Sequence, residues 1–271
     1  MSNLQIYCLS LSSSYLKLIK NLEYLPVGLG DSFFGDEWLK DNTGENITSK
    51  NSSYGEYTFH YWLWKNNQIN FSGWIGFCQY RKFWKKDFTN NAINNFTDLK
   101  NNVLLDTPKD AEEYESIIGQ DLFVNQFRFS KFWKKNFKIM FLNPTLFFNK
   151  NKRTIKFHFD MMHGLGNLDK AIQLLPFKER GDFKVFVNTE VSFNPHNMFI
   201  CKNKKILFDY YDSLFPWLED CEKIFGFENS NSYGLQRIYG FLAERYMSYW
   251  FKKYTKFKIL PIQFKDLRDF L

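Results

Sequence analysis

Residues 74–82, WIGFCQYRK, decide how this chain folds. Up to Tyr80 the segment carries no charge and is mostly apolar on successive positions, which is typical of a strand buried on both faces of a sheet. The run stops at Arg81 and Lys82, so two cations follow a predicted central strand. Because the ligands of open α/β sheets bind at the carboxyl ends of the strands, we expect these cations to face a ligand.

The elements before this strand have the order of an α/β sheet. Apolar runs predict strands at 4–9 and 24–27, and the aromatic-rich stretch at 53–65 predicts a buried helix. Ser53 and Glu56 have the spacing of a capping box at the start of that helix. Glu56 is therefore expected to cap the helix, and its carboxylate is also able to accept from a ribose or sugar hydroxyl.

Polar segments separate these elements. The stretch DNTGENITSKN at 41–51 consists of turn formers that cannot build a core, and loops of this kind carry function more often than regular elements do. Residues 85–115 are polar and Asn-rich, and are expected to form surface loops with a short helix. The later elements are expected to be a helix at 161–175 ended by Pro176, a strand at 191–203, and helices at about 206–225 and 233–254.

The composition describes a folded, globular chain. Its 271 residues include 32 Phe, 15 Tyr and 8 Trp, far more apolar surface than disordered chains carry. The net charge of +7 is compatible with nucleic acid, anionic membranes or phosphate-bearing ligands as partners, but an AT-rich genome also enriches Lys and Asn. The four cysteines are widely separated, so neither a zinc site nor a disulfide framework is expected.

Several common catalytic motifs are missing from the sequence. It contains no Gly-rich P-loop, no G-x-S-x-G elbow and no G-x-G-x-x-G after a strand. No D-x-D pair follows the central strand, where many sugar-nucleotide enzymes hold a divalent metal. Arg81 instead offers a planar fork of donors that fits a diphosphate. We therefore expect a metal-independent diphosphate site, with Mn or Mg left open as cofactors and a strand-end salt bridge of Arg81 as the alternative.

Two groups in the second half are candidate substrate contacts. The string HFDMMHG places His158, Asp160 and His163 close together, a set that suits an acid–base pair, a metal site or structural hydrogen bonds. Of these, we expect Asp160 or His163 to contact a substrate. Arg237 and Glu244 lie on one line of the predicted last helix, which indicates a polar line facing a cleft, with an ordinary surface stripe as the alternative.

Several longer strings, taken together, resemble one protein family. PVGLGD at 26–31, DNTGENITSKNSSYGEYTFHYWLWKN at 41–66 and WIGFCQYRKFW at 74–84 are similar to the N-terminal half of a family of bacterial capsular and surface polysaccharide glycosyltransferases, long described only as a domain of unknown function. NMFICKN at 197–203 and RIYGFLAER at 237–245 are similar to its C-terminal signature. The resemblance covers most of the chain.

The resemblance implies a GT-A-like α/β fold. It implies a single domain over residues 1–271 with a central mostly parallel sheet, a donor-nucleotide half to about residue 110, and a helical acceptor half from about residue 150. It also implies transfer of a sugar, with galactofuranose among the sugars associated with the family, from a UDP-sugar. The acceptor would be an oligosaccharide, a polysaccharide or a lipid-linked glycan.

The family's functional positions fall on defined residues of this sequence. The implied donor pocket comprises Asp41, Asn42, Thr43, Asn46, Lys50, Asn51, Glu56, Tyr80, Arg81 and Lys82. The implied second-half positions are Asn197, Arg237, Glu244 and Arg245, to which the chemistry of the residues adds His163 as an acceptor contact. Arg81 with Lys82 is expected to stabilise the departing diphosphate, and Asp160 and Glu244 are the candidate bases for the acceptor hydroxyl.

Two departures from the family pattern bear on this pocket. Gln79 stands where the family usually has His, and Lys82 stands where it has a second Arg. Gln keeps a hydrogen-bonding group and Lys keeps the charge, so diphosphate binding is expected to survive, whereas an acid–base role of that His is not. The first strand ends in LSL at 9–11 in place of Thr-His-Lys, so contacts of those side chains to the donor base are not carried over.

The sequence also predicts where the protein works. It begins without a secretory signal, and the longest uncharged apolar-looking stretch, 139–148, is about half of a membrane span. A cytoplasmic location is therefore expected. The Phe- and Lys-rich stretch FRFSKFWKKNFK at 127–138 leaves open peripheral contact with the cytoplasmic face of the inner membrane.

Two other functions remain as alternatives. A sugar-phosphate transferase acting on the same kind of glycan would release a nucleoside monophosphate. A non-catalytic nucleic-acid-binding module would use basic and aromatic surfaces, with an affinity that falls steeply with salt. Because the aromatic residues cluster in predicted buried elements and no RNA-binding signature is present, we expect no nucleic-acid partner.

Overall fold

The computed structural model describes residues 3–126, 149–227 and 233–271. They form two compact units. Unit 1 comprises Met1–Gln120, Asn197–Ser213 and Phe251–Leu271, and unit 2 comprises Asp121–His196 and Leu214–Trp250. Neither unit is continuous in the sequence, and the single-domain organisation stays a prediction.

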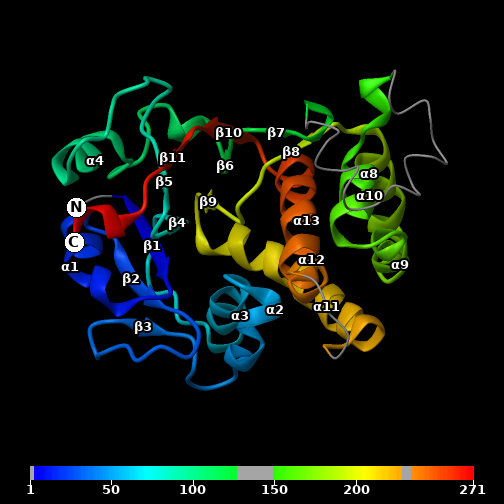
Figure 1. Ribbon diagram of the computed structural model, residues 1–271, viewed down its shortest axis with the longest axis horizontal. Helices are drawn as coiled ribbons and strands as arrows, with labels where there is room; N and C mark the ends of the chain where they lie inside the picture. The colour runs from blue at the N-terminus through cyan, green and yellow to red at the C-terminus, as the bar shows by residue number, and fades with distance from the viewer. Residues whose placement is uncertain (1–2, 127–148, 228–232) are drawn as a thin grey trace. The chain divides into compact units, whose positions relative to one another are not determined.

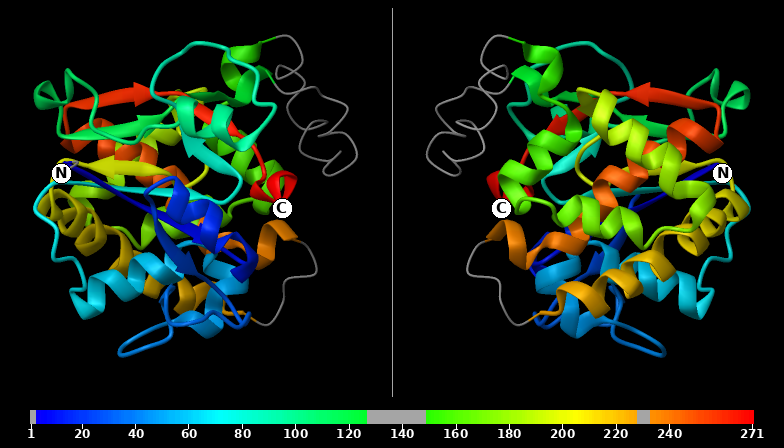
Figure 2. Two further views of the ribbon diagram at one scale, coloured as in Figure 1. Left: turned by 90° about the vertical axis from the view of Figure 1, so that its left-hand side faces the viewer. Right: turned by 90° about the vertical axis from the view of Figure 1, so that its right-hand side faces the viewer.

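A mostly parallel sheet of nine strands forms the centre of unit 1 (Figure 1). The strands are β1 (Leu4–Ser10), β2 (Leu25–Gly28), β3 (Leu39–Lys40), β4 (Trp74–Gln79), β5 (Lys82–Trp84), β6 (Ser116–Gly119), β9 (Phe199–Cys201), β10 (Phe257–Leu260) and β11 (Ile262–Phe264). The order β10-β6-β9-β4-β1-β2-β3 can be followed in Figure 2. Parallel pairing joins β3, β2, β1 and β4, and also β6 and β10, whereas β9 runs antiparallel between β4 and β6. The predicted central, mostly parallel sheet is confirmed.

Helices cover both faces of this sheet. The helices of unit 1 are α1 (Leu16–Asn21), α2 (Asn51–Tyr54), α3 (Tyr57–Asn66), α4 (Phe96–Asn102) and the first ten residues of α11 (Lys204–Phe225). On one face, Phe59 of α3 lies 5.5 Å from Tyr7 of β1, ring centre to ring centre. On the other face, Ile19 of α1 and Leu99 of α4 share an apolar cluster with Cys8 of β1. Alternate residues of a strand point to opposite faces, which is why β1 can be buried on both.

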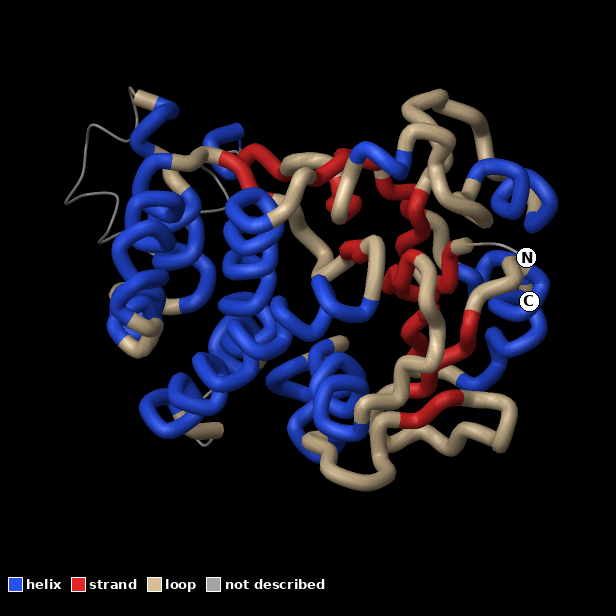
Figure 3. Tube along the Cα trace, turned by 180° about the vertical axis from the view of Figure 1, so that it is seen from behind, coloured by secondary structure: helices blue, strands red, loops and turns tan. Residues whose placement is uncertain are grey.

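Unit 2 is almost entirely helical, as Figure 3 shows. It contains α8 (Ile155–His163), α9 (Asn167–Gln173), α10 (Phe177–Thr189), α12 (Tyr233–Gln236), most of α13 (Ile238–Tyr254), the second part of α11, and the paired strands β7 (Leu122–Phe123) and β8 (Ser192–Phe193). Its core is aromatic. The centre of the Trp217 ring lies 5.0 Å from the centre of the Tyr246 ring and 5.9 Å from that of Phe183. The Trp217 indole also donates a hydrogen bond of 2.7 Å to the carbonyl of Ala171.

The capping box predicted at Ser53 and Glu56 is wrong. Ser53 lies inside α2, and Gly55 interrupts the helix with φ +59° and ψ −131°, a conformation that is readily accessible only to glycine. Glu56 occupies the N-cap of α3 but makes no side-chain capping bond. The capping box that does form joins Asn95 and Asp98 at the start of α4.

Two other elements are broken where the sequence predicted continuity. The helix expected at 161–175 is divided into α8 and α9, because Gly164 adopts φ +96° and ends α8. The strand expected at 191–203 is divided into β8 and β9, since His196 and Asn197 both have positive φ. The helix α10 was not predicted.

The remaining predicted elements are confirmed with small shifts. The strands at 4–9, 24–27 and 74–80 correspond to β1, β2 and β4, and the short helix within 85–115 is α4. The helix at 206–225 corresponds to α11, and the one at 233–254 corresponds to α12 and α13 with a break at Arg237. The segment 127–138, for which the sequence left contact with a membrane open, lies outside the described residues.

Candidate functional site

The carboxyl ends of β1, β2, β3 and β4 meet at one edge of the sheet, because these four strands run parallel. We call these ends, together with the residues directly after them, the carboxyl edge; they are Ser10–Ser12, Gly28–Asp31, Lys40–Asn42 and Gln79–Lys82. β4 lies between β1 and β9, which confirms that Arg81 and Lys82 follow a central strand.

Arg81 is an exposed cation in the turn between β4 and β5. Its guanidinium carbon lies 4.8 Å from the centre of the Tyr80 ring, and that ring stacks on Tyr15 at 5.3 Å. Within the described part of the chain, no acidic side chain forms an ion pair with Arg81. A guanidinium held against a ring face keeps its charge and its N–H donors for an anion.

Gln79 connects two charged side chains at the end of β4. Its Nε2 donates to Oε1 of Glu56 at 2.7 Å, and its Oε1 accepts from Nζ of Lys82 at 3.0 Å. The neutral amide therefore contacts both the carboxylate and the ammonium. The sequence predicted a hydrogen-bonding role for Gln79, and the structure shows these two contacts.

Asp41 supplies a buried carboxyl group directly after β3. Only 2% of the residue is exposed. Burial raises the pKa of Asp41, an effect that the nearby hydroxyls of Thr58 and Thr48 partly offset. Among the described residues its Oδ2 has no hydrogen-bond partner, although a cavity of about 310 Å³ lies against the residue. A buried polar oxygen beside a cavity is typical of a ligand contact.

Two of the predicted donor contacts shape the loop that follows β3. Trp62 donates through Nε1 to the carbonyl oxygen of Thr43 at 2.8 Å and to its Oγ1 at 3.1 Å. Asn46 donates to the carbonyl of Gly44 at 3.0 Å and accepts from the Thr48 amide at 3.3 Å. Both side chains therefore fix the loop conformation.

Asn51 ties this loop to the start of α3. Its Nδ2 donates to the carbonyl of Gly55 at 3.0 Å and to Oγ1 of Thr58 at 3.2 Å. Asn42 is exposed and lines the cavity beside Asp41, whereas Lys50 is half-buried at the end of a short 3₁₀ turn.

The sequence did not indicate every residue at this edge. Tyr15 supports Tyr80 by stacking, and no local pattern could reveal the pair because the two rings are far apart in the sequence. Gly28 and Gly30 line the Asp41 cavity, and their only signal was a turn-rich GLGD after the second strand. Ser10 forms a turn by donating to the carbonyl of Ser12 at 2.8 Å.

Unit 2 contains a second candidate site, a cavity of about 530 Å³ that we call the helical cavity. Its apolar and aromatic walls come from Leu122, Met161, Met162, Phe193, Pro195, Tyr233, Leu235 and Phe241. Its polar side chains are His158, His163, His196, Glu244 and Arg245. Three residues that were predicted separately, His163, Glu244 and Arg245, are thereby brought into one lining.

Glu244 is the carboxylate of this lining, and its side chain is 12% exposed. Oε1 accepts from the backbone amide of His196 at 2.6 Å, and the other oxygen is ion-paired with Arg245. The contact to His196 also supports a backbone turn with positive φ. Because a carboxylate has about four lone-pair directions, these two contacts leave Glu244 able to accept from a ligand hydroxyl.

Arg245 is a buried cation whose charge is compensated within the cavity lining. Its guanidinium carbon lies 4.1 Å from the centre of the Phe193 ring, and Nη2 lies 3.3 Å from Nδ1 of His158. Burial, with the charge of Arg245, lowers the pKa of His158 to about 3, so that imidazole stays neutral. Among the described residues, Nε of Arg245 has no hydrogen-bond partner.

His163 is held in the helical cavity by a carbonyl and a ring. Its Nδ1 lies 3.2 Å from the carbonyl oxygen of Gly234, and its ring stacks on Phe241 at 4.0 Å. A carbonyl oxygen can only accept, so this contact assigns a proton to Nδ1 of His163. The prediction that His163 contacts an acceptor remains a prediction.

Three other predicted residues lie outside this lining. Asp160 accepts from Nζ of Lys156 at 2.6 Å and from the backbone amide of Gly166 at 3.1 Å, so both of its oxygens serve the junction between α8 and α9. Arg237 donates to the hydroxyl of Tyr233 at 3.2 Å. Asn197, which follows His196, belongs to unit 1. Of the two candidate bases, Glu244 is the one that lines the cavity.

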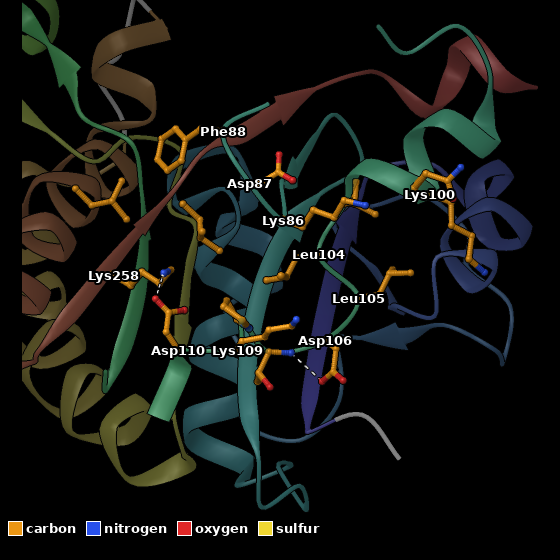
Figure 4. Close-up of a pocket in the computed structure, with 16 residues that line it drawn as sticks. Lys86, Asp87, Phe88, Lys100, Leu104, Leu105, Asp106, Lys109, Asp110 and Lys258 are labelled. Atoms are coloured by element: carbon orange, nitrogen blue, oxygen red, sulfur yellow. Dashed lines mark hydrogen bonds and ion pairs between the residues drawn. The ribbon is translucent and has the colours of Figure 1, made fainter. Parts of the chain in front are cut away.

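A larger cavity of about 760 Å³ in unit 1 shares no lining residue with the carboxyl edge (Figure 4). Its charged side chains interact largely within the protein: Lys258 is ion-paired with Asp110, and Lys100 lies 3.3 Å from Oε1 of Glu23. The carboxylate of Asp106 accepts from the next backbone amide at 2.8 Å. Volume alone therefore does not identify this cavity as the functional site.

In residues 3–126, 149–227 and 233–271, no three His, Cys, Asp or Glu side chains gather closely enough to hold a metal ion. Within the same ranges, no helix combines the length and the apolar character needed to cross a membrane. The metal independence predicted from the sequence stays a prediction.

The fold and the carboxyl edge define a mixed α/β protein with a central mostly parallel sheet, and comparisons with known proteins place it in a family. The family model described as a domain of unknown function, DUF4422, matches residues 9–256, and the chain belongs to this family. The solved apo structure of WbbM, described as a bifunctional glycosyltransferase, matches with a TM-score of 0.65 and 21% identity. The match covers 97% of this chain and 45% of WbbM, so the chain spans less than half of that protein. No curated protein matches.

These findings support the family and the fold that the resemblance implied. The fold of the chain is like that of a solved glycosyltransferase. The capsular acceptor, the UDP-sugar donor and galactofuranose stay predictions.

Proposed function

We propose that this chain is a GT-A-type glycosyltransferase that moves a sugar from a UDP-sugar donor to a glycan acceptor. The observation that carries the proposal is Arg81, an exposed cation at the carboxyl end of the central strand with no ion pair among the described residues. A diphosphate needs such a cation, and this edge is where α/β sheets bind ligands. The fold match to a glycosyltransferase supports the same assignment.

The carboxyl edge would act mainly on the leaving group. When the bond between the sugar and the diphosphate breaks, negative charge develops on the diphosphate oxygen. Arg81 would meet that charge with a guanidinium already placed by Tyr80, and Lys82 would add a second cation. Asp41 would contact the nucleotide from the cavity beside β3.

Glu244 would act on the acceptor. In an inverting transfer, a carboxylate takes the proton of the acceptor hydroxyl while the oxygen forms the new bond to the sugar. Glu244 is favoured over Asp160 because it lines a cavity, whereas both oxygens of Asp160 are bound within its own helical junction.

A panel of nucleotide sugars tests the proposal, with product analysis and thermal stability as readouts, in EDTA and with Mn or Mg. We expect one UDP-sugar to stabilise the protein and to be hydrolysed slowly to UDP in EDTA. Release of UMP would instead indicate the sugar-phosphate transferase. No response to any nucleotide, with salt-sensitive binding of nucleic acid, would indicate the binding module.

The finer parts of the proposal rest on the sequence resemblance. They are galactofuranose as the sugar, a capsular or related surface glycan as the acceptor, and a cytoplasmic location at the face of the inner membrane. The segment proposed to touch the membrane, 127–138, lies outside the described residues. Sedimentation with anionic liposomes tests that contact, and absence of binding would remove it.

A further inference from the structure

We propose that the helical cavity binds an uncharged glycoside that carries an apolar group. The ligand's hydroxyls would meet Glu244 and the cavity histidines, and its apolar part would lie against the methionine and aromatic walls. Interpreting this ligand as the acceptor rests on the proposed glycosyl transfer, but the binding itself does not.

Charge is the first argument for an uncharged ligand. The lining contains one cation and one carboxylate, Arg245 and Glu244, and they are ion-paired with each other. His158 lies against Arg245 and is kept neutral by burial. A charged ligand would therefore give up part of its hydration in this cavity without gaining a counter-ion, which is costly.

The walls provide the second argument. Phe193 and Phe241 offer ring faces, while Met161, Met162 and Leu235 offer flexible aliphatic surface. Aromatic faces suit the C–H face of a sugar ring, and methionines adapt to apolar groups of different shape. A nucleotide is a poor match for such a lining, because its phosphates would need unpaired cations.

The polar side chains provide the third argument, because they are arranged for hydrogen bonding. Arg245 is only 2% exposed, yet its Nε has no hydrogen-bond partner among the described residues. Glu244 keeps lone pairs beyond its contacts to His196 and Arg245. A ligand hydroxyl at Glu244 would donate to the carboxylate without protonating it.

Three ligands of matched structure test this inference on the intact protein at pH 8, where ordinary imidazoles are neutral. They are n-octyl β-D-glucopyranoside below its micelle concentration, methyl β-D-glucopyranoside, and n-octyl β-D-glucuronide. We expect one molecule of the octyl glucoside to bind per chain, with roughly tenfold or greater losses for the methyl glucoside and for the glucuronide. Equal affinity for the glucoside and the glucuronide would overturn the inference.

A pair of variants locates the binding. Met162→Gln is close in size and adds polarity to the cavity wall, so the octyl glucoside should bind at least about fivefold more weakly while the methyl glucoside changes little. Val185→Gln, on the exposed surface of α10, is the control and should bind as the wild type does. Wild-type affinity of the Met162 variant would contradict the assignment.

The outcome is independent of the donor site. Glycoside binding is measured without nucleotide, and UDP binding is measured without glycoside. If UDP binds and none of the three glycosides does, this inference is removed and the proposed transferase stands. If the octyl glucoside binds and no nucleotide does, the proposed transferase is removed and this inference stands.

Discussion

The carboxyl edge of unit 1 and the helical cavity of unit 2 use similar residue types in opposite ways. Both contain an arginine and have a glutamate in or next to them. At the edge, Arg81 is exposed and has no ion pair among the described residues, and Gln79 contacts both Lys82 and the neighbouring Glu56. In the cavity, Arg245 is buried and directly ion-paired with Glu244.

This difference teaches that pairing and burial, more than residue type, indicate what a site binds. An uncompensated cation at an exposed edge attracts an anion, and it can meet charge that develops during a reaction. A compensated pair in a buried lining has no net charge to offer, so its remaining hydrogen-bonding capacity suits neutral hydroxyls.

The largest expected effect comes from Glu244→Gln. Loss of the base should lower acceptor-dependent transfer by about a thousandfold, while slow hydrolysis of the donor stays within about twofold. Gln keeps an oxygen that accepts from the His196 amide, so the fold of the turn is preserved. Release of UDP with and without acceptor measures both rates, and an equal fall of the two would show that Glu244 does not act on the acceptor.

Arg81→Ala should lower transfer and donor hydrolysis together, by about a hundredfold. The thermal midpoint should hardly change, because the side chain is exposed and its loss breaks no ion pair to a described residue. Lys86→Ala, which removes another exposed cation of unit 1, is the matched control and should keep full activity. Near-normal turnover of the Arg81 variant would end its assignment to the diphosphate.

The neutral state of His158 predicts how stability depends on pH. Its pKa is about 3 in the folded protein and 6.5 as an ordinary imidazole, so below pH 6.5 the unfolded chain binds a proton that the folded chain does not. Stability therefore falls as the pH decreases, by about 2 kcal/mol between pH 7 and pH 5 for this group. Urea unfolding of His158→Gln should be less pH-dependent by that amount.

His60 in unit 1 provides the comparison for that experiment. Burial lowers its pKa to about 3 as well, and its Nδ1 lies 2.6 Å from the hydroxyl of Tyr211. His60→Gln should reduce the pH dependence by a similar amount. An unchanged pH dependence of the His158 variant would mean that His158 keeps its ordinary pKa of 6.5 when folded, and the description of a buried imidazole that stays neutral at pH 5 would be wrong.

The smallest effect is expected from Glu56→Ala. The change leaves Nε2 of Gln79 without its carboxylate and loosens the amide that contacts Lys82. The KM for the donor should rise by about tenfold with little change in kcat, whereas Glu56→Gln, which keeps an acceptor oxygen, should stay close to the wild type. A fall in kcat at constant KM would contradict this role.

The sheet could be predicted from the sequence because its central strands are long apolar runs. β1 and β4 were found in this way, and the position of Arg81 followed directly. β5 and β11 have three residues each and pair with strands distant in the sequence or across a tight turn, so no local pattern indicates them. Short strands are specified by tertiary pairing more than by propensity.

The breaks in unit 2 could not be predicted because they depend on single backbone conformations. Gly164 ends α8 with φ +96°, where the apolar pattern alone favours one longer helix. His196 and Asn197 adopt positive φ, which is uncommon for residues other than glycine. The contact between Glu244 and the amide of His196 supports that turn, and it is visible only in the folded chain.

Only part of the site could be predicted from the sequence, because contacts between distant residues form only in the folded chain. Family resemblance indicated Asp41, Arg81, Glu244 and Arg245, and the structure places them at the carboxyl edge or in the helical cavity. The resemblance also assigned Thr43 to the donor pocket. In the structure, Thr43 accepts from Trp62 and shapes the loop. The sequence identifies residue types at the right positions, but the pairing that distinguishes the two sites depends on the fold.

The central claim is that the carboxyl edge binds the diphosphate of a nucleotide through Arg81. Calorimetric titration of UDP and of uridine in EDTA, into the wild type and the Arg81→Ala variant, tests it most directly. We predict that the variant binds UDP about tenfold more weakly or worse, and that uridine binds both proteins equally. Equal affinity of both proteins for UDP would contradict the account.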